Sequence, residues 1–382
     1  ALFLAERGAK VVLLESHRVG WGASGRNGGQ LIGGLQGDQR ISRQLGQTGA
    51  DLVGSLWYRG HDIIEDRVRR YAIACDFKRG FIEVAAKPAH VGALEAYVGA
   101  MVQSGVAPQM TMVDRAETAR LVGTDRYFGG FLDPRSGHCH PLNLCLGEAR
   151  AAASLGAVIH EGTEVLGIEH GRRPVVVTTH GRVAAGAVVI AGNAYHNLER
   201  RRLGGLLFPA GTYVIATAPL PADTVRRLNP QNLAVSDSNM ALDYFRFAAD
   251  GRLLFGGLCN YDGRDPPDIA AAMRPRLLAV YPELAPVPIT SAWGGMIGIV
   301  ISRVPLIGRT APNVFHLQGY SGHGINVTHI ASEIVADAIG GNANRLELFE
   351  KIRQYRLPVG RWLGNQMLAL GMAYYKAKDR FW

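Results

Sequence analysis

The sequence predicts an α/β protein in which a nucleotide-binding domain with a parallel sheet is joined to an α+β domain with an antiparallel sheet. Two strand–loop–helix patterns, one starting at residue 11 and one at residue 314, are typical of parallel sheets. Segments of alternating hydrophobicity between residues 203 and 293 indicate antiparallel strands. A chain of 382 residues is long enough for two domains with separate cores.

The first pattern opens on a short buried strand, Val11 to Leu14, which ends in Glu15. In Rossmann-like βαβ units a carboxylate in this place accepts hydrogen bonds from ribose hydroxyls. Residues 1–8 have the pattern of the second half of an amphipathic helix, so we expect the first strand and any GxGxxG turn to precede residue 1. The alternative is an ordinary glycine-rich turn with Glu15 as a solvated strand end.

A glycine-rich loop, Gly22 to Gly29, follows this strand. Its glycines and the small Ala23 and Ser24 let backbone N–H groups approach an anion, while Arg26 supplies a charge and Asn27 can both donate and accept. This composition favours a site for a flat, phosphate-bearing ligand.

The second pattern lies near the other end of the chain. Val314 to Leu317 predicts a strand, Gly319 to Gly324 a tight loop, and Ile325 to Ile339 a helix closed by Gly340 and Gly341. The N-terminus of such a helix presents unpaired N–H groups and the positive end of the helix dipole, which can stabilise negative charge on a reduced ring system.

Several motifs in this order resemble the flavin-dependent amine oxidases of the D-amino-acid oxidase superfamily, over residues 1 to about 375. They are ERGAKVVLLE, GWGASGRNGGQ, VVIAGNAY at 188–195, RVPLIGR and GYSGHGIN. Together with WGGMIG at 293–298, GWGASGRNGGQ most resembles the gamma-glutamylputrescine oxidases within it. The resemblance implies bound FAD, oxidation of a carbon–nitrogen bond by hydride transfer to the flavin, and reoxidation by O2, giving H2O2, or by another acceptor.

The resemblance also implies a discontinuous organisation. Residues 1–74, 140–202 and 294–345 would form the FAD-binding domain, 75–139 and 203–293 the substrate domain, and 346–382 a C-terminal helical tail. The residues expected at the cofactor are Glu15, Ser16, Ala23, Ser24, Arg26, Asn27, Gly28, Gly29, Gln30, Val165, Ala191, Gly192, Gly294, Gly322, His323, Gly324, Ile325 and Asn326.

Candidate catalytic residues come from two places. His323 is the only side chain in the second glycine loop of a type that titrates near neutral pH. The strand segment ALDYFRF supplies Tyr244, Phe245 and Arg246, and TYVIATAPL supplies Tyr213, as possible lining residues, although aromatic residues on strands belong to the core more often. We expect His323, Tyr244 and Arg246 to act at the site.

Two departures from the resembled family limit which substrates fit and how the cofactor can be attached. Amino-acid oxidases of the superfamily carry an arginine for the substrate α-carboxylate where this chain has Ile297, so an amine without a carboxylate on the oxidised carbon fits better. Gamma-glutamylputrescine is such an amine. Arg246 or Arg303 could restore an amino-acid binding mode, and a non-catalytic protein of the same fold is a third alternative. Sarcosine oxidases attach flavin to a cysteine near the second glycine loop, but no cysteine follows Cys259 here, which predicts non-covalent FAD.

Sarcosine oxidases also end the second loop with a lysine where this chain has Asn326. Asparagine can hydrogen-bond a flavin carbonyl but carries no charge. Stabilisation of the reduced ring would then rest on backbone N–H groups at 322–325 and on the helix terminus.

Composition limits the partners and the location. The net charge of +9 comes from scattered arginine and lysine without interleaved aromatic residues, which favours a solvated surface over a nucleic-acid site. No apolar run reaches the length of a membrane span, and four cysteines fit a reducing, cytoplasmic interior. His138, Cys139 and His140 invite a metal interpretation, but neighbouring strand residues alternate faces, so we expect no metal and a structural His140. The oligomeric state is left open.

The remaining segments predict five further elements. Gln36 to Tyr71 has mostly helical spacing and predicts one long helix, with Trp57 and Tyr58 in the core. Residues 76–86 alternate and predict a hairpin in the second domain. Further helices are predicted over 88–104, 142–155 and 269–281.

Overall fold

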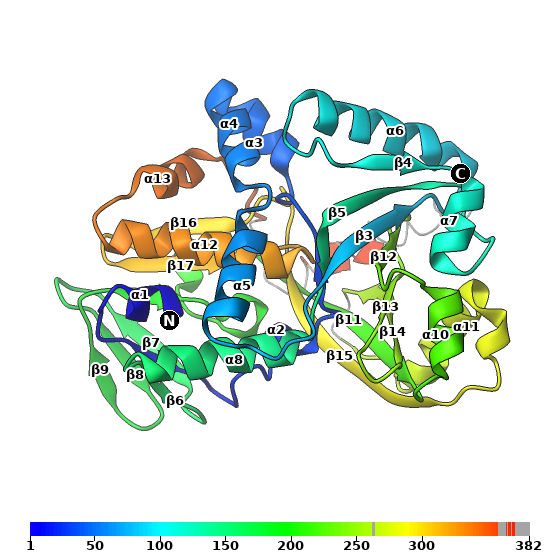
Figure 1. The fold of residues 1–382 in the computed structure, drawn as a ribbon. Helices are drawn as coiled ribbons and strands as arrows, with labels where there is room; N and C mark the ends of the chain where they lie inside the picture. The colour runs from blue at the N-terminus through cyan, green and yellow to red at the C-terminus, as the bar shows by residue number, and fades with distance from the viewer. Residues whose placement is uncertain (262–263, 358–363, 365, 368, 371–382) are drawn as a thin grey trace.

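The computed structural model describes residues 1–261, 264–357, 364, 366, 367, 369 and 370. Short parallel strand pairs form one side of the molecule (Figure 1). β1 (Val12–Leu14) pairs in parallel with β6 (Val158–His160), and β10 (Val188–Ile190) pairs in parallel with β17 (Val314–Gln318), which is antiparallel to β16 (Leu306–Ala311). A separate antiparallel sheet contains β7 (Val165–Glu169), β8 (Val175–Thr178) and β9 (Arg182–Ala184).

One large sheet forms the other side of the molecule, in the order β15-β11-β14-β13-β12-β3-β5-β2, with β4 also paired to β5. Its strands are β2 (Gln30–Leu31), β3 (Lys78–Val84), β4 (Thr111–Val113), β5 (Gly130–His138), β11 (Leu207–Thr217), β12 (Ala234–Asp237), β13 (Tyr244–Phe247), β14 (Leu253–Asn260) and β15 (Ile289–Val300). The antiparallel pairing expected between residues 203 and 293 is confirmed for β11 with β14 and β15. β15 runs without a break across residue 293, and the division into domains stays a prediction.

The helices of the described chain surround these sheets. They are α1 (Leu2–Glu6), α2 (Ala23–Arg26), α3 (Asp38–Leu45), α4 (Gln47–Leu56), α5 (Arg59–Arg70), α6 (Pro88–Gln103), α7 (Arg115–Val122), α8 (Pro141–Ser154), α9 (Arg200–Leu203), α10 (Ala222–Leu228), α11 (Ile269–Val280), α12 (Gly324–Ile339) and α13 (Asn344–Lys351), with 3₁₀ turns η1 (Asn193–Tyr195) and η2 (Pro282–Leu284). The predictions for α6, α8, α11 and α12 are confirmed. No described helix combines the length and the apolar character that crossing a membrane requires.

The single helix predicted over Gln36 to Tyr71 is wrong, because this segment folds as α3, α4 and α5. Gly46 has φ +61 and ends α3, so the next helix restarts in a new direction. A second break falls at Trp57 and Tyr58, which are buried in the main core as expected. The hydrophobic spacing identified the buried face but could not reveal the breaks.

The hairpin predicted over residues 76–86 is also wrong. This segment contains one strand, β3, whose partners are β5 on one side, antiparallel, and β12 on the other, parallel. Both partners lie more than 40 residues away in sequence, at Phe131 and Ala234, for example. Alternation indicates a half-buried strand but carries no information on its partner.

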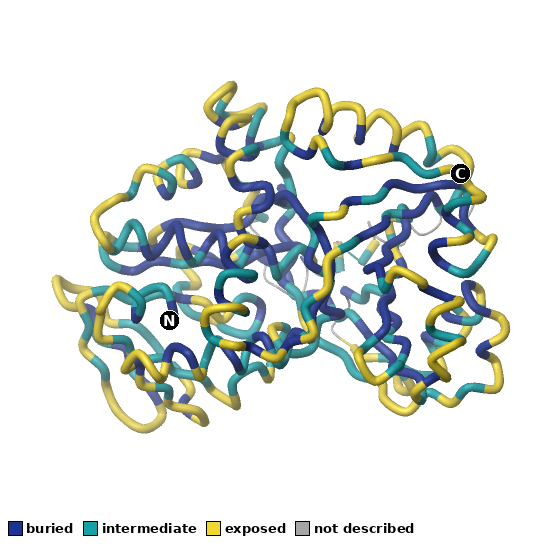
Figure 2. The backbone as a smooth tube through the Cα atoms, viewed as in Figure 1, coloured by how far each residue is buried: buried dark blue, intermediate teal, exposed yellow. Residues whose placement is uncertain are grey.

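The two faces of the large sheet have different surroundings. One face, the outer face, packs Tyr213, Phe245 and Phe255 against α10 and α11. The opposite face, here called the inner face, is defined by paired residues in one row across neighbouring strands: Glu83, Ser236, Tyr244, Gly256, Val214 and Trp293. Figure 2 shows that the strands of this sheet and α12 carry much of the burial. The inner face looks toward the first glycine loop, because a Cβ on Gly28 would lie 2.2 Å from Tyr244 and Trp293 donates its indole N–H to the Arg26 carbonyl oxygen.

A network of charges fastens α12 to the helices around it. Glu148 on α8 accepts from Arg67 on α5 at 2.7 Å and lies 3.0 Å from Nε2 of His329 on α12. Nδ1 of the same histidine lies 2.7 Å from the carbonyl oxygen of Ile325 in the first turn of α12. Although burial opposes it, the nearby His329 and Arg67 lower the pKa of Glu148 to about 2.

We expect Glu148→Gln to lower the free energy of unfolding at pH 7 by about 3 kcal/mol, since the buried Arg67 then loses its shorter ion pair and keeps only the 3.4 Å contact with Glu6. A carboxyl with a lowered pKa stabilises the fold above its ordinary value of 4.5, and this contribution disappears as pH falls toward 2. Urea unfolding should therefore show a smaller difference in the free energy of unfolding between the wild type and Glu148→Gln at pH 3 than at pH 7. Glu117→Gln, which removes an exposed partner of Arg120, is the control and should leave the free energy of unfolding nearly unchanged at either pH.

The predicted C-terminal tail, residues 346–382, lies mostly outside the described residues. Its beginning is part of α13, whose Leu346 and Phe349 pack into the main core. Ala369 packs against a buried cluster of Ala210, Tyr261 and Ile299.

Candidate functional site

Glu15 stands at the end of β1, as predicted, and its backbone joins it to the neighbouring strand. Its N–H donates to the carbonyl oxygen of His160 at 2.9 Å, and its carbonyl oxygen accepts from Thr163. The carboxylate accepts from the backbone N–H of His17 at 2.9 Å and from the exposed Ser16 hydroxyl at 3.4 Å. This leaves one carboxylate oxygen, Oε2, with no described partner, in the place where a ribose hydroxyl would donate.

Arg26 connects the first glycine loop to the edge of the large sheet. Its Nε donates to the carbonyl oxygen of Trp21 at 2.6 Å and one Nη to that of Gly294 at 3.1 Å, while Trp293 donates its indole N–H to the Arg26 carbonyl oxygen at 2.8 Å. Trp21 in turn stacks on His17 with ring centroids 3.7 Å apart. The segment from Glu15 to β15 is therefore one continuous set of contacts.

The rest of the first loop approaches the inner face without side chains. A Cβ on Gly28 would lie 2.2 Å from the Tyr244 ring, and a Cβ on Gly29 would lie 2.1 Å from the Cys139 carbonyl oxygen. Asn27 folds back on the loop: its amide nitrogen donates to the carbonyl oxygens of Ala23 and Ser24, and its oxygen accepts from the Gly29 N–H. Glycine is required at both positions because the chain touches the sheet there.

Gln30 continues this segment into β2 and is half-buried. Its amide nitrogen donates to the carbonyl oxygens of Val235 at 3.2 Å and Phe245 at 3.4 Å. Its Oε1 is buried and has no hydrogen-bond partner among the described residues. Such an acceptor is available to a ligand or a water molecule.

The second glycine loop approaches the sheet from the other end of the chain. Ser321 donates its N–H to the carbonyl oxygen of Gly298 at 2.9 Å, and a Cβ on Gly322 would lie 3.7 Å from Ile297. Gly319 donates to Oδ1 of Asn193, just after Ala191 and Gly192, which are exposed at the end of β10. The ends of β10 and β17 thus meet the same part of β15.

The N-terminus of α12 is open. No side chain caps it, and a Cβ on Gly324 would meet no described atom within 4 Å. The N–H groups of Gly324, Ile325 and Asn326 belong to the first turn, where helices lack internal acceptors. His323 precedes the helix and its Nε2 lies 3.0 Å from the Ile32 carbonyl oxygen; burial lowers the pKa of this imidazole. A neutral His323 therefore carries its proton on Nε2.

The side chain of Asn326 is fully occupied by protein groups. Its nitrogen donates to the carbonyl oxygens of Gly34 at 2.9 Å and Trp57 at 3.2 Å, and its oxygen lies 3.1 Å from Nδ1 of His61. It is 1% exposed. Sequence reasoning placed this amide at the flavin carbonyl, whereas the structure gives it the task of tying α12 to the segment Leu31 to Gly34. Only its backbone remains available at the helix start.

Arg246 lies on the inner face beside Tyr244, but it is 3% exposed. Its Nε donates to the Gly28 carbonyl oxygen at 2.7 Å and one Nη to that of Phe247, and no described carboxylate pairs with it. Burial lowers the pKa of Arg246 and raises that of Tyr244 to about 12. The guanidinium therefore holds the Gly28–Gly29 turn by its hydrogen bond to Gly28. Tyr244 is half-buried and so is the more accessible residue of the pair.

Four other candidates lie elsewhere. Strand alternation puts Phe245 and Tyr213 on the outer face, where both are buried, so neither lines the site. Gly294 pairs with Tyr213, and its carbonyl oxygen is already bound by Arg26. Val165 begins β7, where it pairs with Thr178. It lies two residues after Thr163, whose backbone N–H donates to the Glu15 carbonyl oxygen. It is connected to the Glu15 end of the arrangement rather than to the inner face.

Sequence reasoning missed three residues that hold the arrangement together. The Tyr195 hydroxyl accepts from the Met296 N–H at 2.8 Å, Asn193 joins the loops after β10 and β17, and His61 supports Asn326. Asn193 has φ +47, a conformation in which asparagine is favoured, so AGNAY carried a local signal. Nothing in the sequence indicated Tyr195 or His61.

His138, Cys139 and His140 take structural places. His138 is buried and its Nε2 lies 2.9 Å from the Asn232 carbonyl oxygen, while His140 caps α8 by accepting from the Asn143 N–H at 3.3 Å. Among the described residues no three His, Cys, Asp or Glu side chains come together as metal ligands would.

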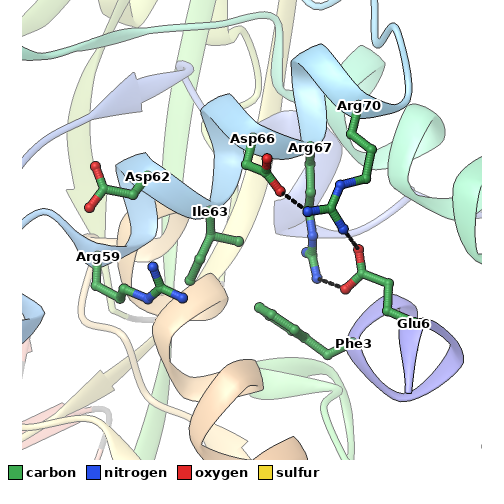
Figure 3. Close-up of a pocket in the computed structure, with 8 residues that line it drawn as sticks. All are labelled: Phe3, Glu6, Arg59, Asp62, Ile63, Asp66, Arg67 and Arg70. Atoms are coloured by element: carbon green, nitrogen blue, oxygen red, sulfur yellow. Dashed lines mark hydrogen bonds and ion pairs between the residues drawn. The ribbon is translucent and has the colours of Figure 1, made fainter.

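A pocket between α1 and α5 is lined mainly by charged side chains (Figure 3). Its charges are paired: Arg70 binds Asp66 at 2.6 Å and Glu6 at 3.6 Å, and Arg67 also binds Glu6. None of the predicted site residues lines it. The glycine loops and the inner face, rather than this pocket, bring the predicted residues together.

Comparison with known proteins agrees with this arrangement. A model of the FAD dependent oxidoreductase family, DAO, matches residues 1–338. The chain is 41% identical to gamma-glutamylputrescine oxidoreductase of Escherichia coli K12, covering 100% of this chain and 89% of that protein, and 36% identical to the probable oxidoreductase OrdL of Haemophilus influenzae, with the same coverage. The structure of glycine oxidase from Bacillus cereus superposes with a TM-score of 0.75 at 19% identity, covering 94% of this chain and 95% of that one. The chain belongs to the DAO family of FAD-dependent oxidoreductases.

Proposed function

We propose that this enzyme oxidises the primary amine of gamma-glutamylputrescine, or of a related polyamine derivative, to an imine that water hydrolyses to an aldehyde and ammonia. The observation that carries this proposal is Ile297 on the inner face, opposite Gly322 of the second glycine loop. An apolar side chain in this place leaves no fork for an α-carboxylate. The 41% identity to a gamma-glutamylputrescine oxidoreductase supports the same substrate.

The residues present fit a flavin dinucleotide. Glu15 at a strand end suits a ribose, and the uncapped start of α12 offers N–H groups to an electron-rich ring oxygen. The buried Oε1 of Gln30 is a further free acceptor. We propose that FAD is held here without a covalent bond, since the chain has no cysteine after Cys259.

The protein's own residues would bind and orient the amine. Bound FAD supplies a hydride acceptor for the carbon next to the amine nitrogen. Neutral His323, whose proton is held by the Ile32 carbonyl oxygen, adds no positive charge to the site. Tyr244 and the apolar Ile297 limit water and disfavour the ammonium form, so the reacting amine binds neutral.

An amino-acid substrate is the alternative. Arg246 would have to bind its carboxylate, yet this guanidinium is 3% exposed and already donates to Gly28 and Phe247. We further propose that O2 accepts the electrons from the reduced flavin and is converted to H2O2. The low cysteine content supports a cytoplasmic location.

A spectrum of the purified protein tests this function. We expect flavin absorption that acid precipitation releases into the supernatant, and anaerobic bleaching by gamma-glutamylputrescine but not by glycine, sarcosine or D-alanine. In air, H2O2 and ammonia should appear together. Bleaching by the amino acids alone would overturn the amine assignment, and flavin retained in the precipitate would overturn non-covalent binding.

A further inference from the structure

Glu83 is a carboxylate on the inner face that nothing in the described structure neutralises. It lies in the middle of β3 and is half-buried, and no hydrogen bond or ion pair to it is found among the described residues. Burial and the nearby Asp237 raise the pKa of Glu83 to about 7. A carboxylate in this position opposes folding, because its charge loses water without gaining a partner.

The register of the sheet places Glu83 in the same row as Tyr244. Glu83 pairs with Ser236 on β12, and Ser236 pairs with Tyr244 on β13. Directly paired residues project from the same face of a sheet. Two strand spacings of about 4.8 Å each separate Glu83 from Tyr244, or about 10 Å between their backbones. The row continues through Gly256 and Val214 to Trp293, which binds the first glycine loop.

The surroundings of Glu83 are negative or neutral. Asp237 on β12 and Tyr97 on α6 are the titratable groups near it, and its paired neighbours Phe131 and Ser236 are uncharged. Asp237 is itself satisfied by the N–H groups of Asn239 and Asp243. The described residues therefore supply no cation to Glu83.

We propose that Glu83 binds a second, distal ammonium group of the substrate, so that the enzyme selects amines carrying another positive charge about 10 Å from the reacting end. This deepens the proposed function and rests on it. Gamma-glutamylputrescine has such a group in its α-ammonium. A charge-assisted hydrogen bond from ammonium to carboxylate provides the recognition, and Glu83 is a binding residue that takes no part in the oxidation.

The test compares Glu83→Gln with the wild-type holoenzyme on two amines. Gamma-glutamylputrescine carries the distal ammonium, whereas N-acetylputrescine lacks it. We expect the variant to raise KM for the first at least tenfold with kcat nearly unchanged, and to change KM for the second less than twofold. Glu95→Gln, which removes an exposed charge from α6, should change neither. Equal effects on both amines, or none on the first, would overturn the proposal.

Two further readouts separate recognition from a structural role. The Tm of Glu83→Gln should equal or exceed that of the wild type at pH 8, because an unpaired buried charge is removed. The wild-type KM for gamma-glutamylputrescine should rise below about pH 7, as Glu83 takes up a proton, and the variant should lose this dependence. If a flavin-loaded wild type oxidises neither amine, the proposed function fails. Perturbation of the flavin spectrum by 1,6-diaminohexane, tight in the wild type and weak in the variant, would still support Glu83, and equal binding would refute it.

Discussion

Replacing Gly29 with alanine is expected to lower the free energy of unfolding by about 3–5 kcal/mol and to leave the protein without flavin. The new Cβ would lie 2.1 Å from the Cys139 carbonyl oxygen, a backbone atom that cannot rotate away, and the backbone has φ +81. Relief would require the first glycine loop to move off the inner face, and the Gly28 carbonyl oxygen would then leave Arg246. Urea unfolding and flavin absorbance after gel filtration measure both effects.

Gly8→Ala is the matched control for this prediction. Gly8 has a similar φ of +76, but a Cβ there would meet no described atom within 4 Å. It therefore carries the conformational cost alone, about 1 kcal/mol, and should retain flavin. Equal stability of the two variants would show that the loop does not depend on its contact with Cys139.

Asn326→Ala is expected to cost about 3–5 kcal/mol and to weaken flavin retention. The variant leaves the carbonyl oxygen of Gly34 and Nδ1 of His61 without their Asn326 partner inside the protein, where an unsatisfied group costs about 1–3 kcal/mol. It also releases the first turn of α12 from the segment Leu31 to Gly34. Denaturant unfolding and the flavin-to-protein absorbance ratio measure these changes.

Asn313→Ala provides the comparison for Asn326. Asn313 also donates to two backbone carbonyl oxygens, those of Gly171 and Arg172, but these hydrogen bonds are exposed to water. We expect it to cost less than about 1 kcal/mol, since water replaces the amide. A loss of stability equal to that of Asn326→Ala would indicate that burial is not what makes the interior amide important.

Local patterns predicted the parts of this protein that local physics determines. The strand ending in Glu15 and the glycine loop opening α12 were found because strand, turn and helix signals are adjacent in the sequence. The break at Gly46 was missed because a single glycine does not interrupt the hydrophobic spacing from which a helix is predicted. The partners of β3 were missed because pairing is decided across the sheet, where β5 and β12 compete with the chain's own neighbours.

The candidate site shows the same division. Gly28 and Gly29 were identified from composition, yet their reason, close contact with Tyr244 and Cys139, is visible only in three dimensions. Asn326 was recognised as unusual for its position, but its partners at Gly34 and Trp57 come from more than 260 residues away, and no sequence pattern shows them. Glu83 looked like an ordinary polar residue on an alternating strand.

The meeting of the two glycine loops on β15 has a consequence for biosynthesis. Arg26 closes onto Gly294, and Ser321 closes onto Gly298, so the cradle needs residues from the beginning of the chain and from beyond position 320 at once. A ribosome-bound intermediate holding only the first two thirds of the polypeptide has no completed cradle. Contacts of such long sequence separation form late and slowly. The two loops can therefore close onto β15 only after the residues beyond position 320 have been synthesised.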